Sequence, residues 1–517
     1  MIGSINSVNY TAYSAPADKL EATSSNNAAQ TREMEFSYNP QDETVMDPIT
    51  IDLNTEHGRT AKAPRTENVK FIKGERLKPN SDGSYVFDKG TKNYVAANSM
   101  ATIQHTIDSM EKILGYDITF AFGDKQIGLA PDAGVDLNAY YSRDEESLNF
   151  FHDFDPVKKE TVYSGASGEV ISHEVGHAIL DSVRPGFLTS WSADTNGFHE
   201  AFGDLTALYM STQNDEVCQL AAQQTGGDLS KPSLLSDTGE HMGRAINNKY
   251  GIHDADRDYV RCMINDCKWE DPNNIEGEDP TPEHPVSTEM HDWSRIFSGA
   301  QYDVMAAITK RNMADGMDAA QAIKAAGQED NLVGLGVEDV TGYIGNNECG
   351  TRSTFYMELL TKAVSISPSH DASYRDIALC MLKIDARSNE GKAHDIILNT
   401  FKERNILEEG DDTPAETMGI TAEPRDLTIT LDGPEYGKFA GAEVSGKASN
   451  SIGMMSNPGD KLAKDMKRLI QNGSILYTEP NQVVEKKDLF DKNGNPYVGV
   501  VRWTDGKMVI ERNKMIS

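Results

Sequence analysis

Apolar residues recur with the spacing of an α-helix in three stretches of this 517-residue chain. Residues 97–114, 168–183 and 198–210 each place apolar side chains three or four positions apart, which gathers them on one helical face. These faces consist of Met100, Ile103, Ile107, Met110 and Leu114, then Ile171, Val175, Ala178 and Ile179, and finally Ala201, Phe202, Leu205 and Leu208. Pro185-Gly186 follows the second stretch and ends it. The pattern therefore predicts three amphipathic helices.

Alternating residues and turn sequences predict strands toward both ends of the chain. Residues 68–96 are expected to form a hairpin with Ser81-Asp82-Gly83-Ser84 as its turn. Leu427 to Leu431 alternates as a strand, and Asp491 to Gly494 and Asp505-Gly506 are turns between apolar runs.

The pattern changes at three places and so suggests domain boundaries. Residues 1–65 are polar with little apolar periodicity, so we expect a disordered or pro-region-like segment. Residues 66–410 carry the helical patterns, with a mainly helical part from about residue 200. Residues 411–425 are expected to be a linker, and residues 426–517 a small β-rich module.

Charge and hydropathy exclude some partners. Acidic residues outnumber basic ones by 81 to 49, which gives a net charge of −32. Such a surface repels nucleic acids and anionic membranes, so we expect neither as a partner. No run of 18 apolar residues is present, so no membrane span is predicted.

One short motif suggests metal chemistry. His173-Glu174-Val175-Gly176-His177 lies inside the predicted helix 168–183. Residues four apart share a helical face, so His173 and His177 can bind one zinc ion, with Glu174 placed to act as a base on a water molecule. Gly176 is a poor helix former, and close approach of another chain segment would explain it.

A second acidic pair follows in the next predicted helix. Glu200 and Asp204 are again four residues apart, and a catalytic zinc ion usually has three protein ligands. Glu200 is therefore the expected third ligand, and Asp204 is expected to hold the far nitrogen of a ligand histidine. His199 competes as a metal ligand, but its position beside Glu200 turns it to another face. It is expected to be structural or substrate-facing.

H-E-x-x-H followed by E-x-x-x-D resembles the thermolysin-like branch of the gluzincin metallopeptidases, and the resemblance covers roughly residues 95 to 410. It implies an α+β fold with two lobes, a β-rich N-terminal one and a helical C-terminal one, with a zinc cleft between them. Three further segments resemble parts of this family: Asn138-Ala139-Tyr140-Tyr141, Arg261-Cys262-Met263 and His291 to Ala300.

The resemblance implies a role for each of these segments. Asn138, Ala139 and Tyr140 would belong to an edge strand that pairs with extended substrate. Arg261 would border the pocket for the residue after the scissile bond. His291 would stabilise the oxyanion of the tetrahedral intermediate.

The chain also departs from the family pattern. The 22 residues between His177 and Glu200 are three more than in the family, and Trp191 stands where the family has a tyrosine that binds the transition state. An indole donates a hydrogen bond but is not a phenol. Glu169 matches one calcium ligand of the family, and Asp254 to Asp258 offers another oxygen cluster, so calcium is a second candidate metal.

The sequence thus predicts a zinc endopeptidase that acts on polypeptides, with a monomer favoured. A zinc aminopeptidase is the alternative enzyme, although no G-x-M-E-N-like segment precedes His173. A non-catalytic zinc protein that binds partners through residues 426–517 is the alternative of another class, and an intact Glu174 argues against it. Family members are mostly exported, but residues 1–30 are no standard signal peptide. Export by another route is expected, with a cytoplasmic location as the alternative.

Overall fold

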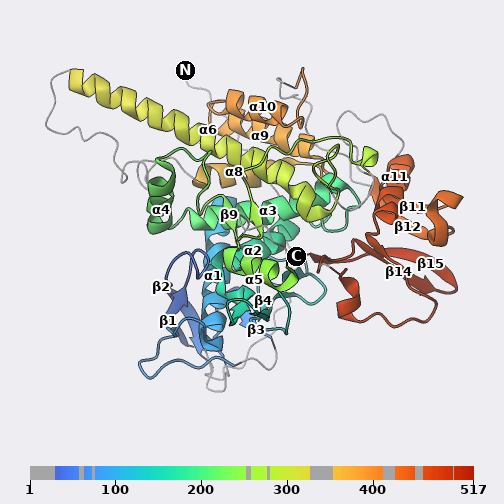
Figure 1. Cartoon of the computed structure of the whole chain (residues 1–517), viewed down its shortest axis with the longest axis horizontal. Helices are drawn as coiled ribbons and strands as arrows, with labels where there is room; N and C mark the ends of the chain where they lie inside the picture. The colour runs from blue at the N-terminus through green and yellow to red at the C-terminus, as the bar shows by residue number, and fades with distance from the viewer. Residues whose placement is uncertain are drawn as a thin grey trace, which may run out of the picture.

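The computed structural model describes residues 30–57, 63–72, 76–251, 258–275, 280–325, 353–411, 425–448, 458–492 and 494–516. It is a mixed α+β structure, as predicted (Figure 1). Among the described residues, no helix is long and apolar enough to cross a membrane.

The larger N-terminal sheet has the strand order β16-β5-β6-β4-β3. Its strands are β3 (Val69–Phe71), β4 (Ile127–Ala130), β5 (Ala139–Ser142), β6 (Ser147–Phe150) and β16 (Met515–Ile516). β3, β4 and β6 run parallel, whereas β5 is antiparallel to both β6 and β16. Three smaller two-stranded pairs are β1 (Gln30–Tyr38) with β2 (Ile49–His57), β7 (His152–Asp155) with β8 (Glu160–Tyr163), and β9 (Asp237–Thr238) with β10 (Arg261–Cys262).

Two expectations for this part of the chain were wrong. Residues 30–57 are not disordered, because Met34, Phe36 and Tyr38 alternate with polar residues and place two of these three side chains in the core. The 68–96 hairpin is also absent. Its turn forms at Ser81 to Ser84, but Val69–Phe71 pairs in parallel with Ile127 to Leu129. Residues 1–29 and 58–62 lie outside the described residues.

The helices form the middle and upper part of Figure 1. They are α1 (Lys92–Leu114), α2 (Gly168–Val183), α3 (Ala193–Ser211), α4 (Asp215–Thr225), α5 (Glu240–Tyr250), α6 (Met290–Ala325), α8 (Ser353–Ile366), α9 (Tyr374–Ser388) and α10 (His394–Glu403). The three predicted helices are confirmed as α1, α2 and α3. α2 has the predicted bounds, and α1 and α3 each begin five residues earlier than predicted. α2 packs against both α1 and α3, and α3 packs against α6.

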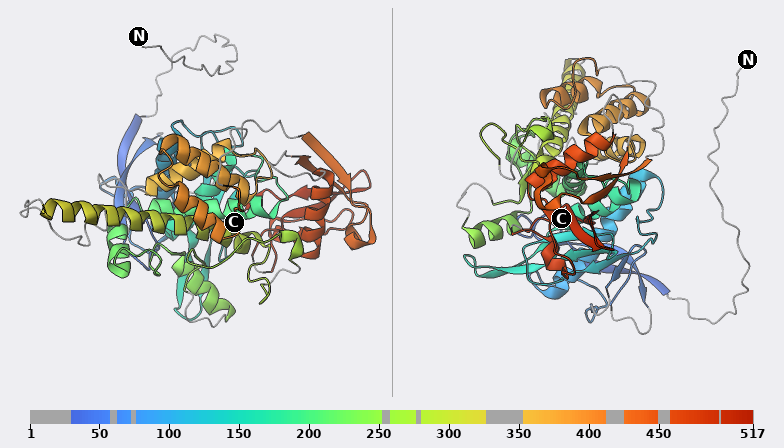
Figure 2. Two further views of the ribbon diagram at one scale, coloured as in Figure 1. Left: turned by 90° about the horizontal axis from the view of Figure 1, so that it is seen from above. Right: turned by 90° about the vertical axis from the view of Figure 1, so that its right-hand side faces the viewer.

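Residues 425–516 form the predicted β-rich module, with the strand order β11-β12-β15-β14-β13. Its elements are β11 (Arg425–Thr430), β12 (Glu443–Ala448), α11 (Pro458–Gln471), β13 (Ile475–Leu476), β14 (Gly499–Thr504) and β15 (Lys507–Arg512). The Asp505-Gly506 turn joins β14 and β15, with positive φ at both residues, as a two-residue hairpin requires. Helix α11 was not predicted. The module lies at one side of the main body in Figure 1 and in the left view of Figure 2, and it lies in front of the main body in the right view. β16 leaves the module to join the N-terminal sheet. Of the predicted linker, residues 412–424 lie outside the described residues.

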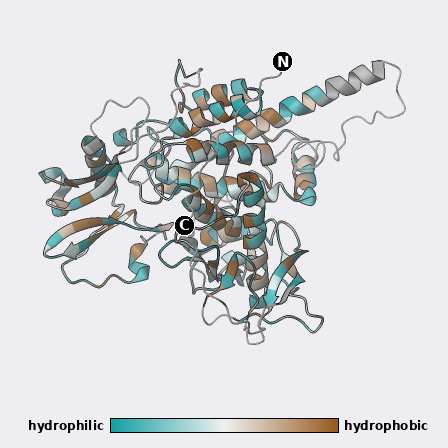
Figure 3. Ribbon diagram, turned by 180° about the vertical axis from the view of Figure 1, so that it is seen from behind, coloured by the Kyte–Doolittle hydropathy of each residue, from teal (hydrophilic) through white to brown (hydrophobic). Residues whose placement is uncertain are grey.

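Apolar side chains of the main body and of the module belong to one continuous core. Brown, hydrophobic segments in Figure 3 recur along the central helices and on the module strands. Trp191, Leu462 and Val501 are members from both sides of the junction. The module is therefore packed against the main body rather than tethered to it.

Candidate metal centre

Helix α2 presents the H-E-x-x-H residues from a fully buried position. The Ser167 side chain caps its first turn by accepting a hydrogen bond from the Val170 amide, and the helix ends at Val183, just before Pro185. One donor atom from each of His173, Glu174 and His177 lies within 4.8 Å of the other two. The predicted juxtaposition of the three side chains is thus present.

Glu200 on α3 faces both imidazoles. Its Oε2 lies 3.4 Å from His173 Nε2, and its Oε1 lies 3.7 Å from His177 Nε2. Neighbouring donors of a tetrahedral zinc site, with bonds of about 2.0–2.1 Å, are about 3.4 Å apart. Each imidazole thus faces one oxygen of Glu200 at a distance near that of neighbouring zinc ligands, His173 facing Oε2 and His177 facing Oε1.

Buried atoms without a partner point to the same place. In the described part of the chain, His173 Nε2, His177 Nε2, Glu200 Oε1 and Glu174 Oε2 are buried without a hydrogen bond. Such atoms normally find a partner, because burial of an unsatisfied polar atom is costly. A cation among the first three would satisfy them, so the residues fit a zinc ion. Two carboxylates are thus available as ligands beside the histidines. Glu174 has a donor atom within 4.8 Å of one on each histidine, and Glu200 faces each imidazole with a different oxygen.

Three residues contact the Nδ1 atoms of His173, His177 and His291. Asp204 Oδ1 lies 3.0 Å from His173 Nδ1, which is the expected contact. His199 lies behind His177, with 3.0 Å between their Nδ1 atoms, and does not line the cavity. Glu289 Oε1 lies 2.8 Å from His291 Nδ1. These contacts orient the rings and leave each Nε2 directed at the site.

The contact of Glu289 with His291 and the contact of His199 with His177 were not predicted from the sequence. Glu289 lies only two residues before His291, so the sequence shows that the two residues are close. It does not show that the Glu289 carboxylate points toward the His291 ring. Glu289 directly precedes α6, and its Oε2 also accepts a hydrogen bond from the His291 amide at 3.0 Å. His199 was expected to be structural or substrate-facing, and its contact with His177 supports the structural reading.

The site is strongly polarised. Burial raises the pKa of Glu174 to about 8, although the nearby His173 and Arg261 oppose the rise. Burial lowers the pKa of His291, but the carboxylates Glu200 and Glu289 outweigh it and raise the value to about 9. Arg261 Nη1 donates to Glu200 Oε2 at 3.1 Å and to Asp204 Oδ1 at 3.0 Å. The buried carboxyl group of Glu174 thus shares the site with the positively charged side chains of His291 and Arg261.

Two glycines set how closely α2 and α3 approach. A Cβ on Gly176 would lie 2.8 Å from Thr206 Oγ1 and 3.0 Å from Gly203 Cα. A Cβ on Gly203 would lie 2.7 Å from His173 Nδ1. The close approach expected at Gly176 is confirmed, and it brings Glu200 within reach of the histidines.

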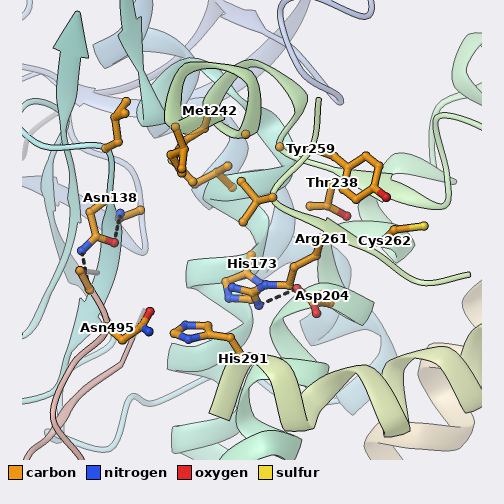
Figure 4. A pocket seen from close by; sticks show the side chains of 18 of the residues that line it. Asn138, His173, Asp204, Thr238, Met242, Tyr259, Arg261, Cys262, His291 and Asn495 are labelled. Carbon is orange, nitrogen blue, oxygen red and sulfur yellow. Dashed lines mark hydrogen bonds and ion pairs between the residues drawn. The ribbon is translucent and has the colours of Figure 1, made fainter. Parts of the chain in front are cut away.

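A cavity of about 520 Å³ opens onto this centre, which is a normal size for a ligand pocket. The predicted site residues that line it are Asn138, Ala139, His173, Glu174, Asp204, Arg261 and His291. Figure 4 shows His173, Asp204 and Arg261 together, with His291 below them and Asn138 across the cavity. Asn495, from the C-terminal module, stands between Asn138 and His291.

Two predicted substrate-binding side chains lie elsewhere. Trp191 is buried under the module, where its indole N–H donates to the Ser445 carbonyl at 3.1 Å, so its predicted place in the cleft was wrong. The Tyr140 side chain is buried beside Phe490 and does not line the cavity. Both side chains are covered by residues more than 250 positions away, which the sequence pattern could not reveal.

The calcium candidates are only partly described. Glu169 is buried beside Glu240, and burial followed by the charge of Glu240 raises the pKa of Glu169 well above its ordinary value. The Gly239 amide donates to Glu169 Oε2 at 3.1 Å. Residues 254–257 lie outside the described residues. Calcium binding therefore stays a prediction.

Comparison with known proteins adds no family: no family model matches this sequence, and no curated protein matches it. The functional argument consequently rests on the site itself.

Proposed function

We propose that this chain is a zinc-dependent metalloendopeptidase of the thermolysin-like gluzincin type. The observation that carries the proposal is the set of buried, unpaired Nε2 and carboxylate oxygen atoms of His173, His177 and Glu200, which are spaced like the ligands of one tetrahedral ion. The adjoining cavity reaches this set through His173, which lines it together with Glu174. A two-lobed arrangement, with the sheet around β5 on one side and the helices from α3 onward on the other, is part of the same proposal.

The catalytic roles follow from position. A bound zinc ion supplies Lewis-acid polarisation of the scissile carbonyl and lowers the pKa of a water molecule. Glu174 takes the proton of the attacking water on its carboxylate and passes it to the leaving nitrogen, as a general base and then a general acid. His291, held by Glu289, donates a hydrogen bond from Nε2 to the oxyanion. Asp204 keeps His173 in the tautomer that directs Nε2 at the metal.

The polypeptide substrate is proposed to lie along β5. The backbone of Asn138 and Ala139 borders the cavity, and an extended peptide can add to a strand edge through main-chain hydrogen bonds. Arg261 lies across the cavity from Asn138 and is proposed to border the residue after the scissile bond. A purely structural zinc protein has no use for Glu174, whose Oε2 is buried and unpaired beside the histidines.

Glu174→Gln tests the proposal, with Glu216→Gln on the exposed first turn of α4 as the matched control. We expect the site variant to retain one zinc ion per chain by elemental analysis. Its peptidase activity should fall by about 10²–10⁴-fold because it lacks the base. Glu216→Gln should behave like the wild type. Unchanged activity in Glu174→Gln, or wild-type activity that survives complete removal of metal by a chelator, would contradict the mechanism.

A further inference from the structure

The C-terminal module contacts the main body on both sides of the cavity. On the α3 side, Trp191 donates to the Ser445 carbonyl, and Arg512 Nη2 donates to Asn196 Oδ1 at 2.6 Å. Near the start of α6, Asn472 Nδ2 donates to Thr288 Oγ1 at 2.6 Å. These contacts are largely buried and hold the module at the mouth of the cavity.

On the β5 side, the module covers the strand that the proposed substrate would use. Lys486 Nζ lies 4.4 Å from the Tyr140 ring centroid and 2.8 Å from Glu145 Oε2. The Phe490 and Tyr140 ring centroids are 5.7 Å apart. The segment before residue 492 therefore packs on one end of β5.

The free edge of β5 is itself partly occupied. A strand has two edges, and β6 takes one of them over the whole length of β5. β16 takes the other, with Met515 opposite Ser142 and Ile516 opposite Tyr141, antiparallel to β5. An extended peptide adds to a sheet in this same manner. The edge at Tyr141 and Ser142 is thus not available to a substrate while β16 is in place.

The occupied end is the one remote from Arg261. Asn138 and Ala139, at the start of β5, line the cavity together with Arg261, whereas Tyr141 and Ser142 do not line it. If Arg261 borders the residue after the scissile bond, substrate residues on that side lie along Asn138 and Ala139. Residues before the scissile bond then extend toward Tyr141 and Ser142, where β16 lies.

The turn before β14 lies against the other end of the strand, beside Asn138. The Asn495 amide donates to Asp491 Oδ1 at 2.9 Å, and the Asp491 amide donates to the Asn495 carbonyl at 2.8 Å, so the turn is braced. Gly494 and Asn495 line the cavity, and the Gly494 carbonyl accepts a hydrogen bond from Asn138 Nδ2 at 3.3 Å. One wall of the cavity is therefore built by the module, as Figure 4 shows.

We propose that the C-terminal module determines substrate length by closing the part of the cleft that would hold residues N-terminal to the scissile bond. The closing element is β16, which occupies the strand edge at Tyr141 and Ser142. This inference rests on the proposed peptidase function. Substrate residues beyond the second before the cleaved bond therefore find no free strand edge and add nothing to kcat/KM.

The test uses peptides that share a cleaved sequence, found by library profiling, and that carry one, two, three or four residues before the scissile bond. The wild type is expected to show the same kcat/KM for two, three and four residues. In a variant that ends at Lys514, and so lacks β16, kcat/KM should rise roughly tenfold when the third and fourth residues are added. These residues can then form hydrogen bonds with the edge of β5. Lys514→Ala is the matched control. It removes the 3.1 Å ion pair with Asp144 but keeps β16, so its length profile should match the wild type.

A paired-cysteine variant provides a second test that keeps the chain length. Ser142→Cys and Met515→Cys place thiols on directly opposed residues, at a separation suited to a disulfide. The oxidised form, in which β16 is fixed to β5, and the reduced form should both keep the flat kcat/KM profile of the wild type. A kcat/KM that rises with the third and fourth residues in the oxidised form would show that β16 does not close the edge. Cleavage of the shortest peptide by the wild type reports on the proposed function alone. If that peptide is cleaved and the shortened variant keeps the flat profile, the closure proposal is overturned.

Discussion

Replacing Gly203 with alanine would place a Cβ atom against the imidazole of His173, a proposed zinc ligand. The added Cβ would lie 2.7 Å from Nδ1 and Cε1 of His173 and 3.0 Å from Cγ. Carbon atoms in ordinary contact are about 3.5–4.0 Å apart, so the imidazole must retreat by roughly 0.8 Å or more. The ring cannot move this far without disturbing its 3.0 Å contact with Asp204.

The expected loss of zinc affinity follows from this displacement. Metal ligands keep their distances within about 0.2 Å, and loss of an outer partner such as Asp204 typically weakens binding 10–100-fold. We therefore expect Gly203→Ala to bind zinc at least 10–100-fold more weakly, which corresponds to about 1.4–2.7 kcal/mol. The free energy of unfolding should change by less than the free energy of zinc binding. The helix preference of alanine over glycine, about 1 kcal/mol, offsets part of an overpacking cost of about 1–3 kcal/mol.

Gly176→Ala is the matched control on the facing helix. Its Cβ would crowd Thr206 and Gly203, but none of its nearest contacts is a metal-facing atom. Zinc affinity is measured by competition with a chromophoric chelator, and unfolding by thermal denaturation with and without zinc. Both variants should lose some stability, and only Gly203→Ala should lose most of its zinc affinity. Equal affinities for the two variants would refute the reasoning.

Two further predictions concern the ligand set and the module. Glu200→Ala should reduce zinc content far more than His199→Ala, because Glu200 faces the ion whereas His199 only orients His177, a role worth about 10–100-fold in affinity. Elemental analysis decides this, and the reverse ranking would rule out Glu200 as the third ligand. Trp191→Ala should weaken docking of the C-terminal module by about 3–5 kcal/mol, because it removes a large buried side chain and its hydrogen bond to Ser445. Limited proteolysis should then release the module, and unchanged resistance would show that Trp191 is not its anchor.

Local sequence patterns predicted which side chains of α2 lie together, namely His173, Glu174 and His177. The four-residue spacings of His173 with His177 and of Glu200 with Asp204 each lie within one helix, and a helix has a fixed geometry. The caps and breakers of α2 are also local, which is why its bounds match the prediction. The alternation of residues in β1 and β2 was equally local but was overlooked beneath a polar composition.

Contacts between distant segments could not be predicted in this way. The 68–96 hairpin failed because Val69–Phe71 found a partner, β4, nearly sixty residues away. Trp191 was expected in the cleft because it stands where the resembled family has a tyrosine that binds the transition state. A module that begins more than 230 residues later covers it instead.

The sequence by itself determined the chemistry of the candidate site: which side chains are available, and on which face of each helix they lie. Only the tertiary structure decided that Glu200 meets both histidines, that Glu289 holds His291, and that β16 occupies the edge of β5. The physical reason is that helix periodicity is a property of neighbouring residues, whereas a contact between elements depends on how their surfaces pack. At this site that packing depends on two glycines, Gly176 and Gly203, that let α2 and α3 approach.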